Sequence, residues 1–187
     1  TMMEILNNQK IEANSLFSKF IEKNYQSWFK NDNHPCLSHE ILKKHLFPEI
    51  SDDPLILIVI DNLRYDQWKI IEPSILSFYN KVKEVPYYSI LPTSTQSRNS
   101  LFAGIMPMHI KQKFPQFWKD DHEEGGKNLF ESKLLNINLN NLKSNNLKNE
   151  FFKITNFKNG VKLSKNLKQL LQNNLTTIVY NFVDTLS

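Results

Sequence analysis

The sequence predicts an α/β fold in which helices flank a parallel sheet and a small helical segment precedes it. Two runs of residues carry this prediction: residues 55–60 form an unbroken apolar run (LILIVI), and residues 176–183 (TTIVYNFV) are rich in β-branched and aromatic side chains. Short β-branched runs are typical of strands that are buried on both faces of a parallel sheet. Because helical patterns lie between the two runs, we expect residues 55–60 to form the central strand, with residues 176–183 beside it.

Composition restricts the class of protein. The 187 residues fit one domain with a small appendage, and a formal net charge of +4 comes mostly from scattered lysines. No arginine-rich patch marks a nucleic-acid partner, and no apolar stretch is long enough to span a bilayer. Cys36 is the only cysteine, which fits a reducing compartment, and the N-terminal residues lack the apolar core of a signal peptide. We therefore expect a cytoplasmic protein with no membrane partner.

The first 50 residues are predicted to be a helical lead-in and linker, followed by one α/β domain over residues 51–187. Apolar residues recur at three- and four-residue steps over residues 2–29, and a second, shorter helix (SHEILKKHLF) begins at Ser38 and ends at Pro48. Three histidines lie in this region, but no acidic or cysteine partner stands at ligand spacing, so a metal site built from them is disfavoured. They are His34, His39 and His45.

The domain alternates between strand and helix patterns. A crossover helix is expected over residues 65–79, and a second strand over residues 82–91, where Pro86 indicates an edge or irregular position. A strand, a tight turn and a short helix are expected over residues 92–107. The remaining expected elements are a helix over 127–135, a loop or weak helix over 136–149, a strand over 151–155 and a helix over 164–172.

Chemistry-bearing residues stand where these strands end. Asp61 follows the first apolar run, Asp184 follows the last, and a hydroxyl-rich turn with Ser94 and Thr95 begins a helix between them. The carboxyl ends of parallel strands form the ligand-binding edge of an open sheet, and a buried carboxylate needs a cationic partner. A divalent cation would meet both aspartates and activate a hydroxyl as a nucleophile. Helix capping by Asp61, and N-capping by Ser94, Thr95 or Ser97, remain open as alternatives.

Four segments together resemble a known family: IDNLRYDQW, YYSILPTSTQSRNSLFAGIMP, DDHEEGGKN and VYNFVDTLS. They are similar to the PglZ-type domain of the alkaline phosphatase superfamily and, within it, to the PorX-type response regulators of Bacteroidetes, which are linked to type IX secretion. The resemblance also includes the helical lead-in. It implies an alkaline-phosphatase-like sheet, of which this chain contains the N-terminal half, and a metal-dependent phosphatase or phosphodiesterase activity.

The resemblance also assigns roles to individual residues. It implies a site for two zinc ions, in which Asp61 and the nucleophile Thr95 hold one metal and Asp184 helps to hold the other. The nucleophile would form a phospho-enzyme intermediate that water then hydrolyses. Arg98 and Asn99, on the helix behind the nucleophile, are expected to orient the phosphate.

The sequence departs from the family pattern in three places. The turn TQSRN is one residue shorter than usual, so that anchoring on PTxTQ makes Thr95 the nucleophile, whereas counting back from Gly104 makes it Ser94. The chain ends at Ser187, one position before the histidine expected to accompany Asp184. The receiver domain that precedes this region in the relatives is also missing. We therefore expect either a fragment of a longer protein or the product of a decayed gene, inactive by itself.

Two classes of function follow. The first is a PglZ-type hydrolase acting on a phosphate ester, with nucleotides, phosphoproteins and glycan phosphates as open candidates. The second is a non-catalytic signalling and dimerisation module in the output of a response regulator. The resemblance implies a homodimer in the parent protein, and a sensor kinase that acts through the receiver domain.

Overall fold

A computed structural model of the chain describes residues 1–79, 83–91, 95–120, 122–142 and 147–181, and divides the chain into two compact units, Thr1–Cys36 and Leu37–Ser187. In the first unit, α1 spans Met2–Asn24 and continues into the 3-10 turn η1, Tyr25–Phe29. Thr1 caps α1 in a capping box with Glu4, which satisfies backbone donors of the first turn. The helix predicted over residues 2–29 is confirmed.

The second unit begins with three short helical turns in place of the single helix predicted from Ser38. They are η2 (Ser38–Glu40), η3 (Leu42–Leu46) and η4 (Phe47–Glu49). Leu42 and Phe47 are buried in the main core cluster, so tertiary packing holds these irregular turns in place.

Three parallel strands form the described sheet: β1 (Leu55–Ile60), β2 (Asn149–Ile154) and β3 (Leu175–Tyr180), in the order β1-β3-β2. The α/β class and the parallel sheet are thereby confirmed. The prediction that residues 55–60 form the central strand is wrong for these three strands, because β1 lies at an edge and β3 in the centre. Burial agrees with this order: β3 is buried over five of its six residues, whereas Ile58 in β1 is 52% exposed.

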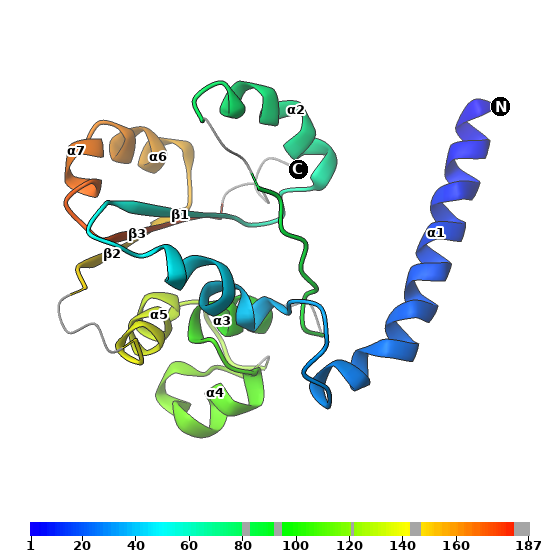
Figure 1. Cartoon of the computed structure of the whole chain (residues 1–187), viewed down its shortest axis with the longest axis horizontal. Helices are drawn as coiled ribbons and strands as arrows, with labels where there is room; N and C mark the ends of the chain where they lie inside the picture. Colours follow the sequence, from blue (N-terminus) through cyan, green and yellow to red (C-terminus); the bar gives the residue numbers. More distant parts are fainter. Residues whose placement is uncertain (80–82, 92–94, 121, 143–146, 182–187) are drawn as a thin grey trace. The chain divides into compact units, whose positions relative to one another are not determined.

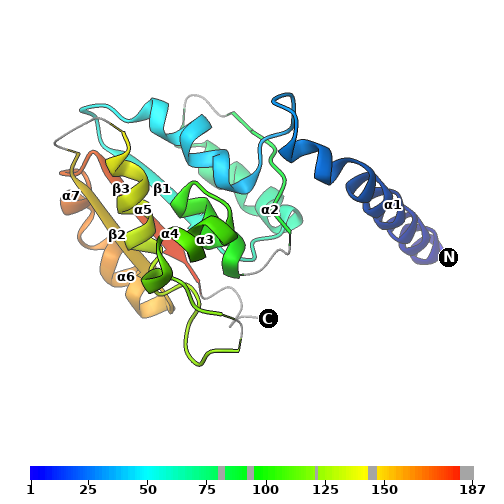
Figure 2. The same ribbon diagram turned by 90° about the horizontal axis from the view of Figure 1, so that it is seen from below.

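Helices cover both faces of this sheet (Figure 1). On one side lie α2 (Tyr65–Leu76), α6 (Phe157–Ser164) and α7 (Leu167–Leu170). On the other lie α3 (Thr95–Ala103), α4 (Pro107–Lys113) and α5 (Glu131–Asn140), as the turned view in Figure 2 also shows. Leu175 and Val179 of β3 pack into the α3/α5 core, and Ile178 packs with Leu170 on the opposite face. This alternation is the two-residue period of a strand that is buried on both sides.

Several predicted boundaries differ from the structure. Residues 83–91 form no strand and make one isolated bridge, between Leu37 and Tyr88; Pro86 in this segment cannot donate to a ladder. The helix predicted over 127–135 is α5, which begins four residues later, and the helix predicted over 164–172 is replaced by α6 and the four-residue α7. The strand predicted over 151–155 is confirmed as β2.

Among the described helices, none combines the length and the apolar character that crossing a bilayer requires.

Gly104 terminates α3 in a left-handed conformation. Its φ is +69°, and its N–H donates to the carbonyl of Ser100 at 2.9 Å. A Cβ added here would lie 2.7 Å from the amide nitrogen of Asn138, which itself donates to the carbonyl of Phe102 at 3.0 Å. Glycine is therefore required here both by the backbone conformation and by the close approach of α5.

Candidate functional site

Asp61 stands at the carboxyl edge of the sheet, directly after β1. Its N–H donates to the carbonyl of Tyr180 at 2.9 Å, which extends the ladder between β1 and β3 by one residue. The next residue, Asn62, has a φ of +58°, and asparagine is among the few side chains that adopt this left-handed conformation readily. The chain therefore turns sharply after Asp61. On the neighbouring strand, Asn181 donates its N–H to the carbonyl of Ile154 at 2.8 Å, so three strand ends meet at this edge.

Arg98, on α3, joins these strand ends. Its Nη1 donates to Oδ2 of Asp61 and, at 2.8 Å, to Oδ1 of Asn181. Its Nε donates to Oε1 of Glu131, the first residue of α5. The Arg98 side chain is 12% exposed, and that of Asp61 is 32% exposed. One guanidinium therefore ties β1, the end of β3 and α5 to α3.

Glu131 is a carboxylate that receives two cations. Its side chain is only 1% exposed, and its Oε2 accepts from Nζ of Lys153 at 3.0 Å while Oε1 accepts from Arg98. Lys153, on β2, also donates to the carbonyl of Asn128 at 3.0 Å. We call Asp61, Arg98, Glu131, Lys153 and Asn181 the Arg98 network. Two carboxylates and two cations make it neutral in total, which is the condition under which buried charges are tolerated.

Asn99, next to Arg98 on α3, attaches a loop to this helix. Its buried amide donates to the carbonyl of Lys127 at 3.1 Å and accepts from Nδ2 of Asn128 at 2.9 Å. One turn earlier, Gln96 donates to the carbonyl of Lys119 at 3.2 Å. These amides fasten both ends of the segment between residues 119 and 128 to α3. A contact between Asn99 and phosphate stays a prediction; the structure gives its amide these partners in the protein.

The same loop contains an aspartate with a lowered pKa. Nζ of Lys111 lies 2.7 and 2.8 Å from the two carboxylate oxygens of Asp120, and the indole nitrogen of Trp118 donates to Oδ1 at 2.8 Å. These hydrogen bonds hold the pKa of Asp120 below its usual range, and the one from Lys111 has the largest effect.

The structure places the sequence-predicted site residues as follows. Asp61 and Arg98 meet at the carboxyl edge, and Thr95 begins α3, three residues before Arg98 and so one helical turn away. The side chain of Thr95, and Ser94 and Asp184 entirely, lie outside the described residues. The convergence of Asp61, Thr95 and Asp184 on one point therefore stays a prediction.

The side chains at this edge offer few donors for zinc. Within the described part of the chain, no three His, Cys, Asp or Glu residues gather in a group that could hold a metal ion. Zinc prefers about four donors, and the carboxylate of Asp61 is already paired with Arg98. The described residues, as they are arranged, do not fit a zinc ion.

Three members of the Arg98 network were missed by sequence reasoning: Glu131, Lys153 and Asn181. Lys153 gave the clearest indication in the sequence, because it stands between Phe152 and Ile154 near the end of a strand. A charged side chain in a half-buried strand needs a partner of opposite charge. Glu131 had no comparable signal, since an acidic residue in the first turn of a helix is ordinary.

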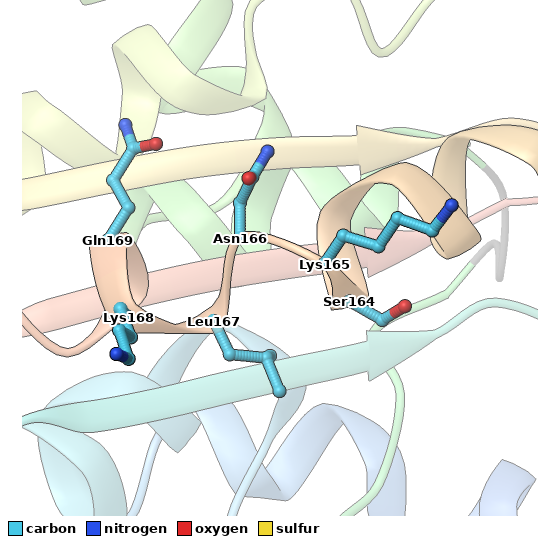
Figure 3. Close-up of a pocket in the computed structure, with 6 residues that line it drawn as sticks. All are labelled: Ser164, Lys165, Asn166, Leu167, Lys168 and Gln169. Atoms are coloured by element: carbon cyan, nitrogen blue, oxygen red, sulfur yellow. The ribbon is translucent and has the colours of Figure 1, made fainter.

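A surface pocket of about 420 Å³ lies apart from this network, at the connection between α6 and α7. Six consecutive residues line it, Ser164, Lys165, Asn166, Leu167, Lys168 and Gln169, and Figure 3 shows them along this connection. No residue of the Arg98 network and no carboxylate contributes to this pocket. The candidate chemistry therefore belongs to the strand ends.

Comparison with known families identifies the domain to which these strand ends belong. A model of the BREX system PglZ alkaline phosphatase-like domain matches residues 41–187, which is most of the chain. The chain belongs to the PglZ family. A second model, that of the PorX response regulator linker domain, matches residues 1–29, and no curated protein matches the chain.

The PglZ match includes every residue of the Arg98 network, and the PorX linker match covers α1 and η1. The resemblance to PglZ-type and PorX-type proteins is thereby confirmed at the level of domains. The alkaline phosphatase-like superfamily to which PglZ belongs is generally metal-dependent.

Proposed function

We propose that this chain belongs to a phosphoric ester hydrolase domain in a PorX-like response regulator. One observation supports the proposal most strongly. Asp61 and Arg98, which are 37 residues apart in sequence, meet at the carboxyl edge of a parallel sheet, one helical turn from Thr95 at the start of α3. In open α/β sheets this edge is the usual place for ligands.

The proposed reaction uses the hydroxyl of Thr95, with Ser94 as the alternative. The hydroxyl oxygen attacks phosphorus and gives up its proton, the bond to the leaving alcohol breaks, and the leaving oxygen takes up a proton. Water then attacks the phosphorus held on threonine, and one of its protons restores the hydroxyl. The product is inorganic phosphate from a monoester, or a phosphate monoester from a diester. Thr95 is the first residue of α3, where free backbone amides and the helix dipole favour the negative charge of a phosphoryl group.

Zinc belongs to the proposal as the cofactor of a complete site. Its donors beyond Asp61 would come from outside the described residues, with Asp184 the first candidate. The substrate class is a phosphate ester, and the candidates are a nucleotide, a phosphoprotein and a glycan phosphate. We also propose the regulatory setting of the PorX type: a cytoplasmic homodimer, a receiver domain addressed by a sensor kinase, and a link to type IX secretion.

A signalling and dimerisation module without catalysis is the second candidate. The observation that favours it is the ion pair between Arg98 and Asp61, because a neutralised carboxylate has little capacity left to organise a metal. In this candidate, the PglZ domain transmits the state of the receiver by its packing, and the Arg98 network contributes to the rigidity of the sheet edge.

Hydrolysis of bis-nitrophenyl phosphate distinguishes the two candidates. We expect no turnover by the 187-residue chain, and turnover by a longer chain that continues with the histidine expected four residues after Asp184. Thr95→Ala should lower the rate of the longer chain at least about a thousand-fold, as loss of a nucleophile does. Ser77→Ala, which removes an exposed hydroxyl at the end of α2, should leave the rate unchanged. A longer chain that binds zinc and does not hydrolyse this ester would favour the signalling module.

A further inference from the structure

We infer that Arg98 is the resident counter-cation of Asp61, and that it keeps divalent cations off this carboxylate until it is displaced. The inference goes beyond the proposed function, because it holds whether or not the chain hydrolyses phosphate esters. The family implies a metal at Asp61, whereas the described residues pair this carboxylate with Arg98.

The contact between Arg98 and Asp61 is built into the fold. The Arg98 side chain is 12% exposed, and its Nη1 donates to Asp61 and to Oδ1 of Asn181, the latter at 2.8 Å. Arginine stays charged at every accessible pH, and its planar fork is preorganised for carboxylates. A metal ion that approaches Oδ2 of Asp61 would therefore be repelled by the guanidinium that is already bound to this oxygen.

Arg98 is held from behind by Glu131. That side chain is 1% exposed, and it accepts from Nε of Arg98 on one oxygen and from Lys153 on the other. Glu131 thus fixes the guanidinium through an atom different from the one that contacts Asp61. If Arg98 loses its contact with Asp61, it still pairs with Glu131. A metal can therefore replace Arg98 at Asp61 without leaving a buried cation unpaired.

Charge balance gives the same answer. Asp61 and Glu131 carry two negative charges, and Arg98 and Lys153 carry two positive charges. A divalent cation added to this neutral group would leave two positive charges uncompensated next to Arg98, whose side chain is mostly buried. Metal uptake at Asp61 therefore requires either the departure of Arg98 or additional anionic ligands.

Zinc titration of the full 187-residue chain by calorimetry tests this inference. For the wild type we expect weak zinc binding that Asp61→Asn leaves unchanged, because Asp61 is not a ligand while Arg98 holds it. Arg98→Gln should tighten zinc binding at least about tenfold, and adding Asp61→Asn to that variant should remove the gain. The matched control is Arg64→Gln, which breaks the exposed ion pair between Arg64 and Asp66 at 2.9 Å and should bind zinc as the wild type does.

Two results would overturn the inference: tight stoichiometric zinc binding by the wild type that Asp61→Asn abolishes, or folded Arg98→Gln protein with unchanged zinc affinity. Circular dichroism of each variant establishes that it is folded. If Arg98→Gln does not fold, the comparison of wild type with Asp61→Asn still decides, since equal affinities support the inference and a loss contradicts it. Hydrolysis is not part of this readout, so its outcome is separate from that of the proposed function.

Discussion

Glu131→Gln removes the carboxylate that Arg98 and Lys153 share and keeps the size of the side chain. Glu131 is 1% exposed, so the substitution leaves two cations around a neutral amide inside the protein. Removing one partner of a buried ion pair typically destabilises a protein by about 3–5 kcal/mol. We expect the lower end, about 3 kcal/mol, because Arg98 keeps Asp61 and Lys153, at 30% exposed, can turn toward water.

Urea unfolding followed by circular dichroism measures this loss, and thermal unfolding should show a Tm lower by about 6–12 °C for a chain of this length. The control is Asp66→Asn, the same chemical change in a pair whose side chains are 70% and 66% exposed; it should leave the urea midpoint almost unchanged, because water screens an exposed ion pair. A Glu131→Gln protein as stable as Asp66→Asn would show that the Arg98 network does not brace the edge of the sheet.

Two further predictions concern the turn after α3 and the loop attached to α3. Gly104→Ala should destabilise the protein by about 1–3 kcal/mol, because φ is +69° and the added Cβ meets Asn138. Gly160 lies in α6, and a Cβ added there would lie 3.5 Å from Cγ2 of Ile154, an ordinary contact. Gly160→Ala should therefore stabilise the protein by about 0.5–1 kcal/mol, and the same urea titration compares the two variants. The folded protein lowers the pKa of Asp120. Its contact with Lys111 therefore stabilises the folded state at pH values above the ordinary aspartate pKa, and this stabilisation is lost as the pH falls through the lowered pKa of the folded state. In an NMR titration the chemical shift of the Trp118 indole N–H should therefore change at a pH below the ordinary aspartate range. Lys111→Gln should move this change to higher pH, and the same midpoint in the wild type and the variant would contradict the assigned cause.

Much of the fold followed from local patterns in the sequence. The apolar run of β1 and the three- and four-residue spacing of apolar residues in α1 were sufficient to predict those elements, because each pattern matches the side-chain period of one kind of element. The order of the strands was not predictable in this way. β1 is the more apolar strand, yet β3, with the buried pair Thr176 and Thr177, is central, because strand order depends on pairings made across the chain.

The candidate site was predictable in one part only. The position of Asp61 after a strand that was predicted to be buried indicated a carboxylate in need of a cation, and the sequence suggested a metal for that role. The structure provides Arg98, 37 residues away, held by Glu131 at a further distance of 33 residues. No local pattern reports such contacts, because they arise only when α3 and α5 pack on the same face of the sheet.

Trapping of the phospho-enzyme tests the central proposal most directly. The longer chain, mixed with the monoester nitrophenyl phosphate and quenched in acid within one turnover, should carry phosphate on its tryptic peptide 84–98, and fragmentation should place that phosphate on Thr95. Phosphate on Ser94 would move the nucleophile by one residue and keep the mechanism. Turnover without phosphate anywhere in this peptide would contradict the assignment of a hydroxyl nucleophile at the start of α3.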